Sequence, residues 1–385
     1  MRTEPTWPPR RALTLAGGGI TGGLYEVGVL LALDTLFADF STLDFDLYVG
    51  ASAGAFVAAL LANGLAPEWL WEATETDRST LPGLTGSRFL HIPWREYLRS
   101  AAALAAALPR VVLDLWTHWH EALVLDTLAG LTRHLPPGIL SLDGLEAYTH
   151  VVLSRGGRTD DFRQLRRRLL IPATALDTGA IQVFGGRPGE ATPISRAVAA
   201  SAAIPLVFAP VRIDGVDYVD ACVTKSAHAG LAVEHGARLV VVVNPIRPLL
   251  LDSAERGLRA TGALGIASQS LRIALERRLR DGLGRHALQH PETDLVLIEP
   301  YERDMALFDV PLMTYNLRTE VIRRGYRTTI KQFLGDWDHY VALFARHGIT
   351  LAERASVEQV SRRWSSGRPE TASRGEARLG AAVPA

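Results

Sequence analysis

Two glycine-rich turns near the start of the chain carry residue types that could perform acyl transfer. The second turn, Gly50-Ala51-Ser52-Ala53-Gly54, has the G-x-S-x-G pattern of a nucleophile elbow, a sharp turn that holds a serine hydroxyl up from the backbone. The first turn, Gly17-Gly18-Gly19-Ile20-Thr21-Gly22, could offer backbone N–H groups to an oxyanion. A nucleophile and an anion-binding loop on neighbouring strands suggest acyl transfer.

Each turn lies between a predicted strand and a predicted helix. Apolar runs at residues 11–16 and 45–49 precede the two turns, and helix-forming runs at residues 23–37 and 53–63 follow them. This context favours a nucleophile elbow over a small-residue turn that merely packs a helix against a strand.

Strand and helix patterns continue through the chain and predict an α/β fold with a mostly parallel sheet covered by helices. Residues 268–283 and 314–333 have long helical patterns. Further apolar, β-branched runs are predicted strands at residues 169–175, 181–184, 239–243 and 295–298.

The stretch from about residue 67 to residue 150 is rich in Ala, Leu and Trp and predicts a helical insertion. Within it, residues 110–125 have an apolar face, which we interpret as a helix packed on the core. The alternative for the wider region 97–134 is a lid or a membrane contact.

The same patterns divide the chain into four parts. Residues 1–10 form an irregular leader, and residues 11–250 form the main domain, which contains the insertion. Residues 251–363 are a mainly helical extension. Residues 364–385 lack periodicity and are predicted to be disordered.

The composition of the chain argues against several classes of binding partner and metal site. The 385 residues include 41 basic and 41 acidic side chains, so the net charge is zero and nothing indicates a nucleic-acid partner. The single cysteine, Cys222, excludes a disulfide within the chain and a cysteine-based zinc site. His118 and His120 would point to different faces of a helix, so no metal site is expected.

The first glycine turn also fits the dinucleotide fingerprint G-x-G-x-x-G through Gly17, Gly19 and Gly22. That fingerprint expects an acidic residue at a strand end about 20 positions later. Asp39 lies near that distance but follows a helix-like run, so the nucleotide interpretation is the weaker alternative.

A nucleophilic serine needs a base. By chain order, His228, His235 and His286 are candidates for a histidine base, but none has a surrounding motif. Asp220 is the carboxylate candidate, because it ends a short strand after a predicted hairpin turn at residues 214–215. The alternative role for Asp220 is to cap a predicted helix at residues 224–234.

Taken together, these motifs resemble the patatin-like phospholipase family. The marks of that family are a glycine-rich oxyanion loop, a G-x-S-x-G elbow and a downstream aspartate in an Asp-Gly pair, which fall here on residues 17–19, 50–54 and Asp220. The likeness covers about residues 11–245. Two further stretches look like the family, at residues 173–179 and 199–205.

The chain departs from the family pattern at three places. Thr21 stands where the family usually has Lys or Arg, which removes a positive charge near the oxyanion. Ala221 replaces the glycine of the Asp-Gly pair, and residues 226–228 replace a common Asn-x-Pro stretch. None of these changes removes a catalytic group, but they bear on substrate preference and on activity.

The resemblance implies a three-layer α/β/α fold and a Ser–Asp dyad without histidine. Ser52 would attack an ester carbonyl, Asp220 would accept its proton, and N–H groups of Gly17, Gly18, Gly19 and Ala53 would bind the oxyanion. No metal and no organic cofactor is implied. The expected substrate is a lipid or another amphipathic ester.

Two other functions stay open at this point. One is an esterase or thioesterase with a histidine base on an α/β-hydrolase fold. The other is a non-catalytic nucleotide-binding protein that uses the turn at residues 17–22. The chain has no apolar run that would form a signal peptide or a spanning helix, so we expect a cytoplasmic location, with peripheral membrane contact open. The oligomeric state stays open.

Overall fold

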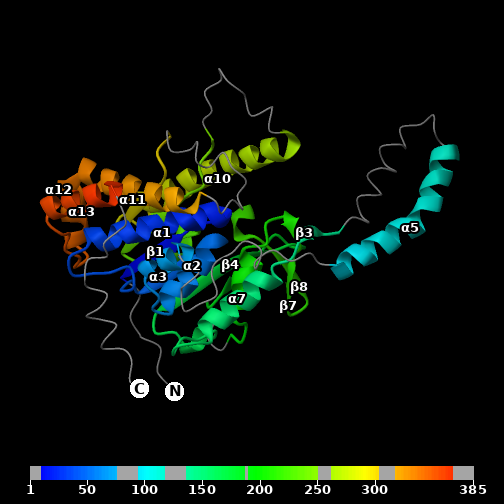
Figure 1. Cartoon of the computed structure of the whole chain (residues 1–385), viewed down its shortest axis with the longest axis horizontal. Coiled ribbons are helices and arrows are strands. Elements are labelled where there is room, and N and C mark those ends of the chain that lie inside the picture. Colours follow the sequence, from blue (N-terminus) through cyan, green and yellow to red (C-terminus); the bar gives the residue numbers. More distant parts are fainter. Residues whose placement is uncertain are drawn as a thin grey trace.

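The computed structural model describes residues 10–75, 94–117, 136–186, 190–249, 262–302 and 317–366. These residues build a mixed sheet with helices on both faces (Figure 1). The predicted α/β fold with a mostly parallel central sheet is therefore confirmed.

The main sheet has the strand order β10-β9-β1-β2-β4-β8-β7, and β5 also pairs with β4. Neighbouring strands from β10 to β4 run parallel, whereas β8, β7 and β5 are antiparallel additions. A second, two-stranded parallel sheet pairs β3 with β6. The strand bounds are β1 Arg11–Leu15, β2 Leu47–Gly50, β3 Gly138–Leu140, β4 Arg168–Ala175, β5 Ile181–Phe184, β6 Leu206–Phe208, β7 Val211–Ile213, β8 Val216–Val219, β9 Leu239–Val243 and β10 Asp294–Ile298.

The helices form two layers, one on each face of the sheet. Alternate residues of β1 pack against different layers. Leu13 and Leu15 pack in a cluster with side chains of α1, α2, α7, α8 and α11, whereas Ala12 and Ala16 pack with α9 and α10. Successive strand residues face opposite sides of a sheet, so each layer lies on its own face. The helix bounds are α1 Gly19–Leu36, α2 Ala53–Ala62, α3 Pro67–Glu75, α5 Trp94–Thr117, α7 Asp143–Leu153, α8 Ile194–Ser201, α9 Ala229–Glu234, α10 Gly262–Gln289, α11 Arg318–Gly335, α12 Trp337–Ala345 and α13 Arg354–Ser366.

Helix α1 is buried almost all round, because α2, α3, α11 and α13 contact it and its side chains share a core cluster with Leu13 and Leu15 of β1. Among the described helices it is the one long and apolar enough to cross a membrane, with a mean hydropathy of 1.2. This differs from the expectation that no such run exists. Since 83% of the helix is buried inside the protein, α1 is a core helix, as all-round hydrophobicity indicates in a packed domain.

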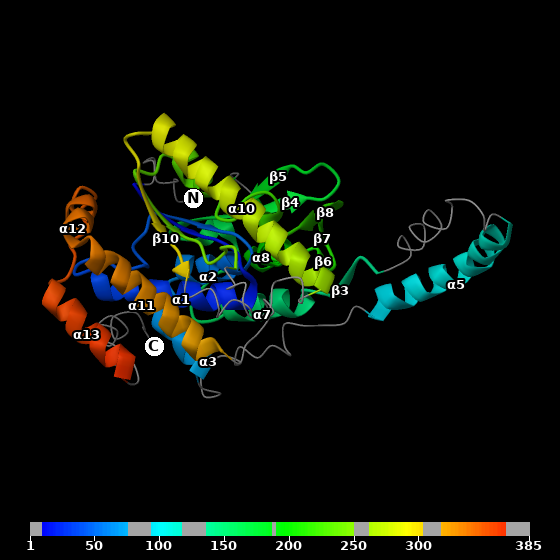
Figure 2. The same cartoon turned by 90° about the horizontal axis from the view of Figure 1, so that it is seen from above.

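The predicted insertion at residues 67–150 contains α3, α5 and α7 in its described parts, with the short strand β3 before α7. Figures 1 and 2 both show α5 projecting away from the sheet. The interpretation of residues 110–125 concerns side chains outside the described part of the chain. Residues 1–9 of the leader and 367–385 of the tail also lie outside it, and the domain limits stay predictions.

The predicted hairpin is confirmed, but the helix after it begins later than expected. Asp214 and Gly215 join β7 to β8 with φ angles of 48° and 85°, the left-handed pair that a tight two-residue hairpin turn requires. Of the helix predicted at residues 224–234, residues 229–234 form α9, while residues 224–228 are not helical and follow a short 3₁₀ turn, η2 Ala221–Val223. His228 has a left-handed backbone (φ 46°), which a right-handed helix does not accommodate, so α9 begins after it.

Two glycines allow α1 and α11 to cross at close range. A Cβ atom added at Gly28 would lie 2.0 Å from the carbonyl oxygen of Ile322, and one added at Gly325 would lie 2.3 Å from that of Tyr25. Backbone therefore packs directly on backbone at this crossing, and no side chain larger than hydrogen fits at either position without a shift of a helix.

We expect Gly28→Ala and Gly325→Ala each to destabilise the protein by about 1–3 kcal/mol, because the added methyl group overpacks the crossing. The matched control is Gly282→Ala in α10, where nothing lies within 4 Å of the added Cβ. There the better helix propensity of alanine should stabilise by about 0.5–1 kcal/mol. Denaturant unfolding monitored by circular dichroism measures all three; equal effects at the three glycines would contradict the close crossing.

Candidate active site

Ser52 lies at a strained turn between β2 and α2. Its φ and ψ angles are 55° and −123°, a conformation that costs a non-glycine residue about 1–3 kcal/mol. The flanking glycines are required by space: a Cβ at Gly50 would lie 2.4 Å from the carbonyl oxygen of Gly54, and one at Gly54 would lie 2.5 Å from that of Ala16. The G-x-S-x-G pattern therefore forms the elbow that the sequence predicted.

Asp220 faces this serine from the end of β8. The Ser52 hydroxyl donates a hydrogen bond to Asp220 Oδ2 at 2.6 Å, and both residues are 2% exposed. The other oxygen, Oδ1, accepts from the backbone N–H of Cys222 at 2.7 Å and so caps η2. One carboxylate oxygen thus faces Ser52, and the other caps η2 rather than the helix that was predicted at residues 224–234.

The backbone of Asp220 is held on both sides. Its N–H donates to the carbonyl oxygen of Ala203 at 2.9 Å, and its own carbonyl accepts from the Thr174 hydroxyl at 3.3 Å. The carboxylate thus has little freedom to move away from Ser52. Neither Ala203 nor Thr174 was predicted to be a site residue.

Burial raises the pKa of Asp220 to about 6, and the hydrogen bonds from Ser52 and from the Cys222 N–H oppose this rise. The carboxyl is therefore still mostly ionised at pH 7, yet it is a stronger base than an exposed aspartate. A base whose pKa lies near the working pH is well suited to accept a proton from a hydroxyl group.

The first glycine turn packs directly against Ser52. A Cβ at Gly17 would lie 2.3 Å from Cys222 Sγ and 2.9 Å from Ser52 Cβ. Gly18 and Gly19 have φ angles of 132° and 62°, which place the loop in a conformation that favours glycine. The loop therefore lies in direct contact with the Ser52 side chain.

Among the predicted oxyanion donors, the N–H group of Gly17 is already hydrogen-bonded within the protein. The Gly17 N–H donates to the carbonyl oxygen of Ser226 at 3.3 Å, so Gly17 lines the site rather than offering a donor. Gly19 and Ala53 are the first residues of α1 and α2. N–H groups in a first helical turn have no acceptor within their helix, and the helix dipole adds partial positive charge there.

Ser201, at the end of α8, is a site residue that the sequence analysis missed. Its hydroxyl accepts a hydrogen bond from the backbone N–H of Ser52 at 2.9 Å and so holds the backbone of the elbow in place. The sequence feature that could have indicated Ser201 is the alanine-rich stretch at residues 199–205. This stretch resembles the family, but no role was predicted for its serine. A serine among alanines is interpreted as a small residue of the packed core unless its hydrogen-bond partner is known.

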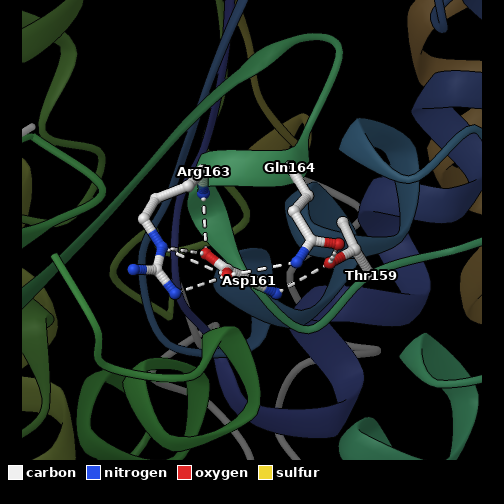
Figure 3. Close-up of polar contacts among 4 residues, drawn as sticks. All are labelled: Thr159, Asp161, Arg163 and Gln164. Carbon is white, nitrogen blue, oxygen red and sulfur yellow. Dashed lines mark hydrogen bonds and ion pairs between the residues drawn. The ribbon is translucent and has the colours of Figure 1, made fainter. Parts of the chain in front are cut away.

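A loop before β4 fixes the start of α8 and so the position of Ser201. Asp160 accepts from both the N–H and the hydroxyl of Ser195, each at 2.7 Å. The next residue, Asp161, caps the 3₁₀ turn η1 (Phe162–Gln164) and pairs with Arg163 at 2.7 Å (Figure 3). These contacts keep the loop, and with it α8, in a defined place.

None of the candidate histidines is hydrogen-bonded to Ser52. His228 is buried and its Nε2 lies 3.1 Å from the carbonyl oxygen of Ala221, while His235 bonds the carbonyl of Leu231 in its own helix. Burial lowers the pKa of His228 to about 4, so its ring is neutral at pH 7. His286 lies against Gly230. The structure therefore gives no support to a histidine base among these residues.

The acidic residue of the nucleotide interpretation is engaged elsewhere. Asp39 accepts from the backbone N–H and the hydroxyl of Thr350 at 2.9 Å and 2.7 Å. No group of three His, Cys, Asp or Glu side chains that could hold a metal ion occurs among the described residues. His118 and His120 lie outside them.

Two cavities meet at Ser52. The larger one encloses about 940 Å³, part of it open to solvent, and its walls are almost wholly apolar. They include Val27, Phe56 and Leu145 from three helices of one layer. The smaller one spans about 500 Å³, which also includes space open to solvent, and reaches from Asp220 to α10. Ser52 thus lines both cavities.

Comparison with known proteins shows the family of this chain. The family model described as patatin-like phospholipase matches residues 13–232, and the chain belongs to that family. The predicted resemblance is therefore confirmed. A search of curated proteins found no match.

Among solved structures, the chain is similar to VipD from Legionella pneumophila, with 17% identity and a TM-score of 0.41 over 84% of this chain and 66% of VipD. It is also similar to ExoU from Pseudomonas aeruginosa, solved in complex with SpcU, with 18% identity and a TM-score of 0.32 over 84% of this chain and 53% of that chain. The chain therefore spans about two thirds or less of these proteins.

The raised pKa of Asp220 predicts a pH-dependent cost in stability. In the unfolded chain the pKa returns to about 3.8, so between pH 4 and pH 6 the folded protein binds more protons than the unfolded one. The wild type should therefore lose stability as the pH rises through this interval. Asp220→Asn removes the charge, and we expect it to be more stable than the wild type at pH 8 by up to about 3 kcal/mol.

Denaturant unfolding of both proteins at pH 4, 5, 6 and 8 measures this effect, because the other titrating groups cancel in the difference. The expected difference shrinks to near zero at the most acidic pH. A difference that stays constant across the series would show that Asp220 does not carry a raised pKa in the folded protein.

Proposed function

We propose that the protein hydrolyses lipid acyl esters by a Ser52–Asp220 dyad through an acyl-enzyme intermediate. The observation that carries this proposal is the 2.6 Å hydrogen bond from the Ser52 hydroxyl to a buried carboxylate at a G-x-S-x-G elbow. Family membership supports the reaction class, since patatin-like phospholipases act on lipid esters. The dyad and its donors are our assignment.

In the first half of the reaction, Ser52 Oγ attacks the ester carbonyl carbon while its proton moves to Asp220 Oδ2. The carbonyl oxygen becomes an oxyanion, which the N–H groups at the starts of α1 and α2 stabilise, notably those of Gly19 and Ala53. Losing one such donor typically costs about 100- to 1000-fold in rate. The intermediate collapses when Asp220 returns the proton to the leaving alcohol, and Ser52 stays acylated.

In the second half, water attacks the acyl-enzyme and gives its proton to Asp220. Collapse of the second tetrahedral intermediate releases the fatty acid, and the proton returns to Ser52 Oγ. The steps balance without a metal or an organic cofactor. Asp220 can act in both directions because its pKa of about 6 lies close to neutral pH.

The larger cavity supports a lipid substrate. Its described walls carry no charged side chain, and it opens directly at Ser52. Burial of apolar surface stabilises a bound acyl chain by about 0.8 kcal/mol for each CH₂ group. We therefore assign this cavity to the acyl chain. The cytoplasmic location expected from the sequence stays a prediction.

We expect Ser52→Ala and Asp220→Asn each to lower the kcat for a short-chain fatty-acid ester by about 1000-fold or more, because each removes one member of a unit that works together. Two matched controls should keep wild-type activity: Ser270→Ala on the exposed side of α10 and Asp214→Asn in the hairpin turn, where asparagine tolerates the left-handed backbone. Hydrolysis is followed by titration of the released acid.

Circular dichroism of each variant separates loss of chemistry from loss of fold. The dyad would be contradicted if folded Asp220→Asn kept near-wild-type activity while His228→Ala lost it. That result would place a histidine in the role of base and would favour the alternative hydrolase interpretation.

A further inference from the structure

The turn that leads into β6 carries an exposed leucine in a strained conformation. Residues 204–207 form a tight turn, in which the Val207 N–H donates to the carbonyl oxygen of Ile204 at 3.2 Å. Leu206, the third residue of the turn, has a φ angle of 70°. A turn with proline second and a positive φ third has the pattern of type II, where glycine or asparagine normally occupies the third position. Leu206 is therefore a leucine at a position where the backbone favours glycine.

The surrounding structure holds this conformation in place. The N–H of Phe208 also donates to the carbonyl oxygen of Ile204, at 2.9 Å, and the Phe208 side chain is buried. Leu206 pairs with Gly138 of β3, and the strands approach so closely there that a Cβ at Gly138 would lie 2.1 Å from the backbone nitrogen of Ala209. Strained residues persist where their surroundings over-determine them, and they concentrate at functional sites. The strain at Leu206 thus points to a function of its side chain.

That side chain is exposed beside the active site. Leu206 is 69% exposed, so it presents a large apolar surface to water. The two preceding residues, Ile204 and Pro205, line the smaller cavity at Ser52, and Ile204 also lines the larger one. Leu206 therefore lies next to the place where the two cavities meet.

Other exposed apolar side chains line the smaller cavity together with Pro205. Val223 of η2 is 36% exposed, and Leu271 of α10 is 44% exposed. We call Pro205, Leu206, Val223 and Leu271 the apolar rim. These residues come from three separate parts of the chain, which the fold gathers at one cavity. An exposed apolar patch beside polar residues marks a surface that another molecule covers.

Basic side chains lie beside the apolar rim. Lys225 is exposed two residues after Val223, and Arg278 of α10, also exposed, donates to the carbonyl oxygens of Val223 and Thr224 at 3.2 Å and 3.3 Å. Apolar side chains next to cations match an anionic lipid layer, because leucine enters the acyl region while lysine and arginine meet the charged headgroups. The proposed substrate is a lipid ester, which such a layer supplies. The charge and the chemistry of the rim therefore fit a lipid surface.

We propose that the apolar rim docks on the surface of an anionic lipid layer and that Leu206 inserts into that layer. The inference rests on the proposed function for the reason to dock, since a lipid ester comes from such a surface, whereas docking itself needs no reaction at Ser52. The proposal also explains the strained turn. Glycine would relieve the strain at position 206 but would leave no side chain to insert.

Binding to vesicles tests the proposal. The vesicles consist of ether-linked phosphatidylcholine with or without ether-linked phosphatidylglycerol, which have no acyl ester to hydrolyse, and co-sedimentation measures the bound protein. We expect Leu206→Gly to weaken binding to the anionic vesicles by about tenfold or more, the effect of losing one buried leucine side chain. Lys225→Gln should weaken binding to the anionic vesicles by about fivefold and binding to pure phosphatidylcholine by less than about twofold.

Two controls distinguish docking from a merely structural role of Leu206. Glycine accepts the left-handed backbone, so Leu206→Gly should not lower the melting temperature although it weakens vesicle binding. The matched control is Leu288→Gln, since Leu288 is 84% exposed and lies about 25 Å along α10 from Leu271. This variant should bind vesicles as the wild type does. Equal losses in Leu206→Gly and Leu288→Gln would show unspecific adsorption and would overturn the proposal.

The absence of an ester in these vesicles separates this proposal from the proposed function. If the wild type hydrolyses no ester but its vesicle binding depends on Leu206 and Lys225, the hydrolase proposal fails and the docking surface stands. If the wild type hydrolyses esters but Leu206→Gly binds the anionic vesicles as tightly as the wild type, the docking surface fails and the hydrolase proposal stands. A wild type that binds neither kind of vesicle also overturns the docking surface.

Discussion

The hydrogen bond between the Ser52 hydroxyl and the buried Asp220 carboxylate is the interaction on which the rest of the site depends. The two residues are 168 positions apart and follow strands that β4 separates in the sheet. Their meeting therefore requires the whole order β2-β4-β8, and Thr174 on the middle strand bonds the Asp220 backbone directly. Burial raises the basicity of the carboxylate, while the 3₁₀ cap at Cys222 keeps it aimed at the serine.

Close backbone approach is the second constraint, and it explains where glycine occurs. Gly17, Gly50 and Gly54 each lie where an added Cβ would collide with neighbouring atoms, so the turn at residues 17–22 and the elbow can touch. Close backbone packing at glycine also occurs away from the site, where Gly28 and Gly325 bring α1 and α11 into backbone contact. Helix α1 begins at the oxyanion turn, and this crossing fixes it against the rest of the core.

Features encoded in short stretches of sequence could be predicted, and features made by distant contacts could not. The elbow at Ser52, the hairpin before Asp220 and the parallel strands follow from local patterns of glycine and β-branched residues. The role of Ser201 depends on which elements become neighbours in the fold, and this residue has no local motif. The helix predicted from residue 224 was wrong at its start, because the left-handed backbone of His228 interrupts it.

The most direct test of the central claim is the rate at which a fluorophosphonate probe modifies the serine, measured by intact mass from pH 4 to pH 9. Our interpretation predicts one adduct on the wild type and none on Ser52→Ala. The modification rate should fall as the pH drops below about 6, where Asp220 becomes protonated, and this dependence should vanish in a much slower Asp220→Asn. A wild-type rate in folded Asp220→Asn, or an adduct on Ser52→Ala, would contradict the dyad.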